Sequence, residues 1–238
     1  MTSPFQFTFT NLEEQYRIAL DEGYQFLTCR QYFLQKDQLP EKAVVNRVDI
    51  DVSVAKADRL RDLFDRLGIK ATFFVRLHAA EYNPFSFENY RILKAIKQSG
   101  HEIGYHSEII DQAAIWNEDP ALCLRRDLEL MSTMLGIPIT GVASHGGMTG
   151  LNNLDFWKTH APAEFSLDYE AYDNGPAFGL FADSFYVSDS EWTRWKCYLH
   201  GELCANDRRS FGEHARSGHA LMYLLIHPET YCREHPYE

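Results

Sequence analysis

Apolar and polar positions along the centre of the chain switch between two periods, which predicts alternating strands and helices. Apolar residues recur at helical spacing before Gly68 and again before Gly100 and Gly136, so a helix is expected to end near each glycine. Short β-branched or apolar runs between these helices have the length of buried strands: residues 44–51, 71–75, 101–106, 139–144 and 221–226. Repeated strand–helix units with short joins predict a parallel sheet with helices outside it.

The two ends of this central region have a looser pattern. Residues 11–33 predict a helix broken near Gly23 and then an extended or helical stretch, and a linker-like piece follows at 35–43. From 146 to 216, short strand candidates at 164–167 and 185–187 lie among Gly, Asp, Asn and Pro, and such long loops usually build or cap a site. We expect one domain over residues 1–238, with 1–43 as an N-terminal helical extension packed on it.

Acidic residues and histidines gather where the expected strands end. Asp49 and Asp51 close the strand at 44–51, and His106 and Glu108 follow the strand at 101–106. His145 and His227 each come directly after a later strand. In a barrel of parallel strands all carboxyl ends meet on one face, where active sites are built. The sequence therefore predicts that these side chains share a site.

The spacing within this set favours a metal ion. Asp49 and Asp51 point to the same side of an extended chain, and two neighbouring carboxylates repel unless a cation or a shared proton relieves them. A divalent ion bound by Asp51 and His106 leaves Asp49 free as a base, and Glu108 could reach the same ion from its i+2 position. Aspartate and neutral imidazole are usual ligands of zinc. Taken singly, each residue has a structural alternative as a helix cap, a turn residue or a buried hydrogen-bonded histidine.

A loop at 186–195 is the candidate wall for a substrate. Trp192 offers an indole for stacking on a sugar ring, and Asp189 and Arg194 are further substrate-binding candidates. Arg194 could pair with a carboxylate, a phosphate or Asp49, although a packed surface loop is the alternative. Arg47, two residues before Asp49, points to the same side and is a further substrate-binding candidate, which either orients the base or balances its charge.

Composition narrows the possible partners and compartments. The net charge of −11 disfavours nucleic-acid binding, which needs a basic face, and no apolar run has the length of a membrane span. The start shows no secretory signal, and the five cysteines are scattered, so reduced thiols in the cytoplasm are expected. Cys197 and Cys204 flank His200 at a spacing that is not typical of structural zinc sites. Oligomeric state is left open.

Four stretches in order resemble the polysaccharide deacetylase family, also called the NodB-homology domain. They are Asp49–Asp51, Lys70–Val75 (KATFFV), Gly100–Ser107 (GHEIGYHS) and Leu224–His227 (LLIH). The resemblance implies an α/β fold, a distorted and incomplete (β/α) barrel, and a metal-dependent enzyme that removes acyl groups from sugars. It also implies that Asp49 is the general base, Asp51 and His106 are metal ligands and His227 is the general acid.

The sequence departs from the family pattern at two places. Ile110 stands where the family has its second metal histidine, so Glu108 or His145 is expected to replace it, with Zn²⁺ as the ion. The family's Arg-Pro-Pro-Tyr motif is missing, and Ser144–Gly147 occupies about its place. These departures resemble a divergent branch associated with bacterial O-antigen or capsule biosynthesis.

The expected activity is therefore metal-dependent removal of an N-acyl group from an amino sugar or sugar-nucleotide. Loss of a family ligand leaves two alternatives open. One is a non-catalytic glycan-binding or assembly protein on the same barrel, and the other is an amidohydrolase of a small cyclic amide or ureide.

Overall fold

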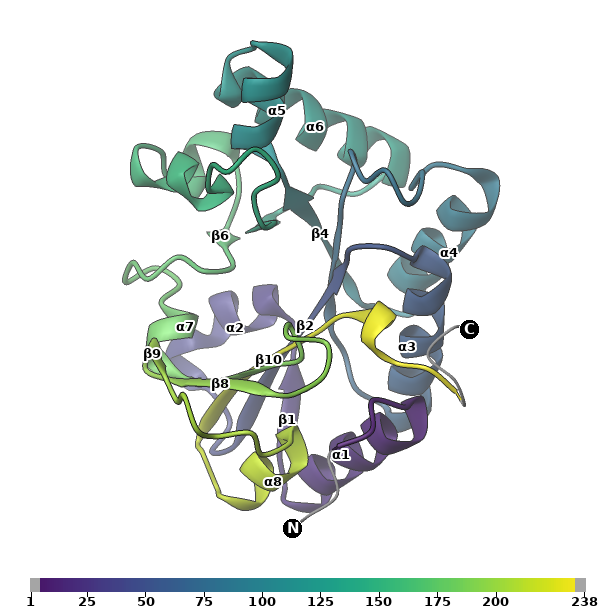
Figure 1. Ribbon diagram of the computed structural model, residues 1–238, viewed down its shortest axis with the longest axis vertical. Coiled ribbons are helices and arrows are strands. Elements are labelled where there is room, and N and C mark those ends of the chain that lie inside the picture. The colour runs from purple at the N-terminus through teal and green to yellow at the C-terminus, as the bar shows by residue number, and fades with distance from the viewer. Residues whose placement is uncertain (1–4, 234–238) are drawn as a thin grey trace.

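The expected alternation builds one open and mostly parallel sheet in the computed structural model, which describes residues 5–233 (Figure 1). The strands run in the spatial order β6-β5-β4-β3-β2-β10-β7-β8-β9, and β1 pairs with β2 beside this path. All pairings are parallel except β7 with β8 and β8 with β9. Because β6 and β9 do not pair, the barrel is incomplete, which confirms the expected fold class.

The strands span β1 (Gln25–Leu27), β2 (Ala43–Ile50), β3 (Thr72–Val75), β4 (Glu102–Ser107), β5 (Gly141–Ser144), β6 (Tyr169–Glu170), β7 (Phe185–Ser188), β8 (Lys196–Leu199), β9 (Glu202–Leu203) and β10 (Leu221–Ile226). The helices span α1 (Phe9–Asp21), α2 (Cys29–Gln35), α3 (Val54–Leu67), α4 (Phe87–Gln98), α5 (Ile109–Trp116), α6 (Pro120–Leu135), α7 (Leu180–Asp183) and α8 (Phe211–Arg216). Within residues 5–233, no helix is both long and apolar enough to cross a membrane.

Local signals fix the ends of the helices that follow the strands. Ser53 accepts a hydrogen bond from the backbone of Lys56 at the start of α3, and Gly68 ends this helix in the left-handed region at φ 69°. Asp119 caps α6 in the same way before Pro120. These caps fix the start of α3 and α6 and the end of α3, which keeps the connections to the neighbouring strands short.

The strands separate two layers of side chains because neighbouring residues point to opposite faces. On β2, Val44, Val48 and Ile50 face an outer core that includes the buried sides of α3, α4 and α6, which lie along the sheet in Figure 1. Val45 faces a smaller inner core with Cys29 and Tyr32 of α2. Each large apolar side chain buried in these layers contributes about 1.5–3 kcal/mol. Asp49 shares the parity of Val45 and so belongs to the inner face.

Two glycines let aromatic rings close on this inner face. A Cβ atom at Gly104 would lie 2.4 Å from the ring of Phe74, and one at Gly141 would lie 2.2 Å from the ring of Tyr169. The two rings meet edge to face at 6.4 Å between centroids. They fill the space next to the strand ends, where the polar residues gather.

Some expectations for the flanking segments were wrong. Residues 164–167 do not form a strand, because Pro162–Phe165 is a 3₁₀ helix in which the Glu164 carboxylate accepts from the backbone of Ala161. The helices α5 and α8 were not expected. At the N-terminal side, α1 ends before Gly23 (φ 87°), and β1 and α2 follow, so the expected break is confirmed.

Candidate metal centre

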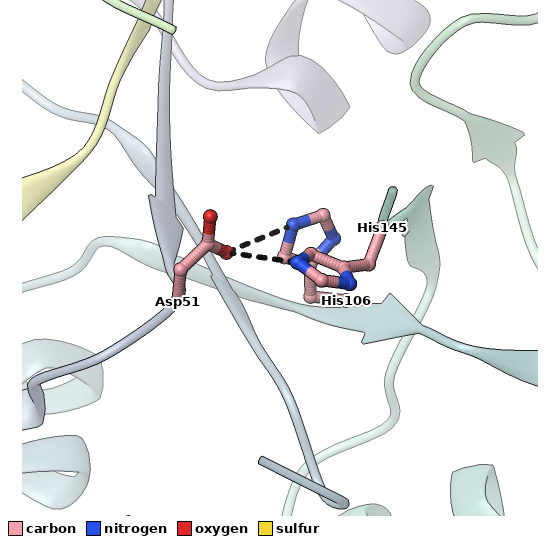
Figure 2. Close-up of side chains that lie close together, drawn as sticks. All are labelled: Asp51, His106 and His145. Carbon is pink, nitrogen blue, oxygen red and sulfur yellow. Dashed lines mark ion pairs between the residues drawn. The ribbon is translucent and has the colours of Figure 1, made fainter. Parts of the chain in front are cut away.

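The strand register brings the candidate residues to one edge of the sheet. Asp49 lies level with Phe74 on β3, and Phe74 lies level with Gly104 on β4, so Asp51 and His106 end up side by side. Nε2 of His106 lies 3.3 Å from Oδ2 of Asp49 and 3.3 Å from Oδ1 of Asp51. Nε2 of His145 lies 3.9 Å from the same Asp51 oxygen, and Figure 2 shows both rings facing this carboxylate.

The orientation of the His106 ring decides what this cluster needs. Nδ1 of His106 lies 2.8 Å from the carbonyl oxygen of Ala143, its neighbour on β5, and so donates its proton there. In the neutral ring Nε2 then carries a lone pair and faces two carboxylates that are also acceptors. Oδ1 of Asp51 is buried and has no hydrogen-bond partner. A cation is the species that satisfies these converging acceptors, so the residues present fit a divalent metal.

The pKa shifts in the cluster also indicate that its carboxylates need a positive charge nearby. Burial opposes a charge on the His106 ring, but the carboxylates of Asp49 and Asp51 raise the pKa of His106 above its ordinary value. Burial also opposes ionisation of Asp51, and the surrounding histidines hold the pKa of this carboxyl well below its usual range. The site is thus built to keep its carboxylates ionised around positive charge.

The positions of His145 and Glu108 differ in what each side chain touches. One ligand atom from each of Asp51, His106 and His145 lies within 4.8 Å of the others, and this group does not include Glu108. Oε1 of Glu108 accepts from Arg76 at 2.7 Å and lies 3.4 Å from Nδ1 of His145. Glu108 therefore lies behind His145, where it can orient the ring.

The departure of Glu108 from the expected position has a local cause. Strand β4 ends at Ser107, and Glu108 is the residue before α5, with φ −123° and ψ 40°. The i, i+2 relation of an extended chain therefore does not hold between His106 and Glu108. Ile110 lies in the first turn of α5.

Asp49 is held by a buried arginine on its own strand. Nε and Nη2 of Arg47 donate to the two Asp49 oxygens at 2.8 and 2.6 Å, and Nη1 donates to the hydroxyl of Tyr223 at 3.1 Å. Burial disfavours the Asp49 charge, but Arg47 outweighs it and lowers the pKa of this carboxyl. The Arg47 side chain is fully buried, so it fits the expected orienting and charge-balancing role and not the expected contact with substrate.

His227 has its own carboxylate partner. Nδ1 of His227 donates to Oδ1 of Asp189 at 2.6 Å, and the His227 backbone donates to the other oxygen. Nε2 lies 3.7 Å from Oδ2 of Asp51. Burial opposes the charged ring, but Asp189 raises the pKa of His227 to about 9. Asp189 is fully buried behind His227, so its position fits a partner of His227 and not the expected contact with substrate.

The rest of the 186–195 loop divides into near and distant residues. The Trp192 ring stacks near His227, with 6.1 Å between centroids and 19° between planes, and is 48% exposed. Arg194 pairs with Glu191 on the surface rather than with Asp49. Trp192 therefore offers an aromatic surface beside the cluster, and Arg194 does not join the cluster.

Sequence reasoning missed two residues that support the centre. Arg76 directly follows β3, so the strand-end rule would have found it, and its Nη1 donates to the Asp51 carbonyl at 2.9 Å. Glu229 accepts from the backbones of Val52 and Ser53 at 2.8 and 2.6 Å. Both fix the turn that follows Asp51, and no local pattern announces Glu229.

A family model and several solved structures are similar to this chain. The family model described as polysaccharide deacetylase matches residues 36–159. No curated protein matches the chain.

Among solved structures, the Streptococcus pyogenes deacetylase PplD in complex with acetate is 19% identical with a TM-score of 0.47, over 65% of this chain and 67% of that one. IcaB from Ammonifex degensii is 18% identical with a TM-score of 0.47, over 68% and 74%. A pseudoenzyme from Bacillus anthracis, BA3943, is 16% identical with a TM-score of 0.44, over 79% and 55%.

Proposed function

The chain belongs to the polysaccharide deacetylase family, and from this premise we propose that it is a metal-dependent hydrolase of N-acylated amino sugars or sugar-nucleotides in polysaccharide biosynthesis. The observation that carries the proposal is the convergence of Asp49 and Asp51 on Nε2 of His106, each at 3.3 Å. His145 and His227 complete the surroundings of Asp51. Such a set of acceptors is suited to one divalent ion and one free base.

We propose that Asp51, His106 and His145 hold the metal, with zinc as the ion. His145 takes the place that Ile110 cannot fill, and Glu108 orients His145 from behind. When bound, the ion polarises the acyl carbonyl and stabilises the negative charge that develops on its oxygen. Asp51 and His145 are partly exposed, so the cluster is open to a substrate.

The neighbouring residues then supply the proton transfers. Asp49, kept ionised by Arg47, accepts a proton from the attacking water. His227, kept protonated by Asp189, donates a proton to the departing nitrogen as the C–N bond breaks. The products are the free amine and a carboxylic acid. Trp192, which stacks beside His227, is the proposed surface for a sugar ring.

Release of acetate from a panel of substrates tests this function. N-acetylated amino sugars and their nucleotide derivatives should release acetate, and cyclic amides or ureides should not react. Asp49→Asn should abolish turnover while the metal stays bound, and Asp62→Asn, on the exposed side of α3, is the matched control. A near-normal rate for Asp49→Asn would remove Asp49 from this role. A protein that binds sugars, but that binds no metal and hydrolyses no substrate, would instead be a glycan-binding member of the family.

We also propose a single domain in a reducing compartment. The five cysteines are free in the structure, which favours the cytoplasm over an oxidising compartment. Residues 9–35 pack on the sheet through β1 and α2, which supports treating the N-terminal segment as part of the same unit.

A further inference from the structure

A second group of metal-ligating side chains lies away from the centre described above. Cys197 on β8, Asp207 in the loop after β9 and His214 on α8 each offer a ligand atom within 4.8 Å of the others. Cys197 and His214 are fully buried, and the Asp207 side chain is 19% exposed. The group thus brings together three segments of the chain: β8, the loop after β9 and α8.

Two of the three separations between the ligand atoms match those around one tetrahedral ion, and the third, between Cys197 and Asp207, is within 4.8 Å. Sγ of Cys197 lies 3.4 Å from Nε2 of His214, and the same nitrogen lies 3.5 Å from Oδ1 of Asp207. Zinc bonds of about 2.0–2.3 Å at tetrahedral angles place neighbouring ligand atoms roughly 3.3–3.6 Å apart. The three side chains therefore need little movement to share an ion.

The His214 ring turns its Nε2 atom, and not Nδ1, toward the thiol of Cys197 and the carboxylate of Asp207. Its Nδ1 is buried and has no hydrogen-bond partner, and its face packs on Phe185 with 4.3 Å between centroids. Helix α8 is fixed by a reciprocal cap between Ser210 and Glu213, so the ring is held in place. A buried imidazole whose Nε2 is aimed at a thiol and a carboxylate is a typical ligand arrangement.

Two neighbours complete the surroundings. Arg209 donates to both oxygens of Asp207, at 3.1 and 2.7 Å, which orients the carboxylate. Cys204 lies opposite Cys197 across the β8–β9 hairpin, because Tyr198 pairs with Leu203, and its backbone donates to the Cys197 carbonyl at 2.9 Å. Its thiol lies 3.9 Å from the Glu202 carbonyl oxygen and would have to turn from there to join the group. His200, which the sequence placed between the two cysteines, instead faces the carbonyl of Ala182.

We propose that Cys197, Asp207 and His214 bind a second zinc ion, with Cys204 as the fourth ligand, in a structural site. The ion fastens α8 and the loop after β9 to β8, at the end of the loop that carries Trp192. A cavity of about 760 Å³ lined by Arg194, Trp195, Asp207 and Arg209 gives the ion a path from solvent. This site is independent of the proposed hydrolase centre.

Cobalt titration of the metal-free full-length protein under reducing conditions tests the proposal. A thiolate bound to Co²⁺ gives an intense near-ultraviolet charge-transfer band, and the Asp51–His106–His145 centre contains no thiol that could produce it. We expect two equivalents of Co²⁺ per chain, one of which generates this band. Cys197→Ala should lose the band and one equivalent, and Cys123→Ala, a buried cysteine on α6, should keep both.

Further variants keep the test decisive if Cys197→Ala fails to fold. Asp207→Asn, at a partly exposed position, should lose the second equivalent and keep the visible bands of the first. Cys204→Ser should reduce the charge-transfer intensity to that of one thiolate. Absence of the band in the wild-type protein, or its survival in both Cys197→Ala and Asp207→Asn, would overturn the proposal. Loss of the first centre through Asp51→Ala should leave the band unchanged, so the two sites succeed or fail separately.

Discussion

The buried ion pair between Arg47 and Asp49 should affect both the free energy of unfolding and its dependence on pH. Arg47→Met removes the guanidinium and keeps an apolar stem of similar length among Tyr172, Phe74 and Tyr223. The Asp49 side chain, 3% exposed, then retains its burial without its main cationic partner. Breaking a buried pair from one side costs about 3–5 kcal/mol in the free energy of unfolding, because one charge is left uncompensated.

The double variant separates the pair from its parts. In Arg47→Met/Asp49→Asn neither formal charge remains, so the loss of stability should be smaller than the sum of the two single losses. For contacting residues joined by two charged hydrogen bonds, we expect a coupling energy of about 2–3 kcal/mol. The measurement is urea unfolding of metal-free protein followed by circular dichroism.

The loss in the free energy of unfolding caused by Arg47→Met should also depend on pH, and its direction can be worked out. In the wild-type protein the lowered pKa of Asp49 adds stability above the ordinary carboxyl pKa, and this is lost in acid. Without Arg47, burial is expected to raise this pKa instead, so the penalty is full at neutral pH and is relieved as the native carboxyl takes up a proton. The deficit should therefore be larger at about pH 7.5 than at about pH 5.5.

A surface pair is the control for this experiment. Arg126 pairs with Glu118 at 2.8 Å, but both side chains are more than two-fifths exposed, so Arg126→Met should cost at most about 1 kcal/mol. A deficit below about 1 kcal/mol for Arg47→Met, or one that does not change with pH, would refute the reasoning about the buried pair.

Two further predictions concern the acid and the inner face. Asp189→Asn should lower the pKa of His227 from about 9 to roughly 7–8, because the variant loses a charge-assisted hydrogen bond. NMR titration of the imidazole in metal-free protein measures this pKa. An unchanged pKa would contradict the role of Asp189. The stability from the charged ring, complete below its ordinary pKa and lost as pH rises through about 9, should shrink with it. Gly104→Ala should cost about 1–3 kcal/mol in thermal unfolding, because its methyl group meets the Phe74 ring at 2.4 Å. Gly146→Ala, where a methyl group meets no atom within 4 Å, should be nearly neutral, and equal costs at both glycines would contradict this packing.

The strand-end rule explains which parts of the site could be predicted from sequence. Parallel strands deliver their carboxyl ends to one edge, so the approach of Asp51 to His106 follows from the two strand assignments and the register. Chain parity along β2 likewise places Arg47 and Asp49 on one face. The relation between Arg47 and Asp49 is local and needs only the period of the chain, whereas the approach of Asp51 to His106 also needs the order and register of β2, β3 and β4.

The contacts that the site residues make beyond the strand ends cannot be predicted from the alternation of apolar and polar positions. The choice between Glu108 and His145 turns on the residue at which β4 gives way to α5. Asp189 meets His227 across 38 positions of the chain, between the ends of two neighbouring strands. The loop position of Asp189 predicts a sugar-facing role, and no sequence signal announces its burial behind His227.

Anomalous diffraction at the zinc edge from crystals of the zinc-loaded protein tests the central claim most directly. We expect a peak within about 2.0–2.2 Å of an Asp51 oxygen and of one ring nitrogen each from His106 and His145. No peak among these three residues, or a peak bound by Glu108 in place of His145, would contradict it.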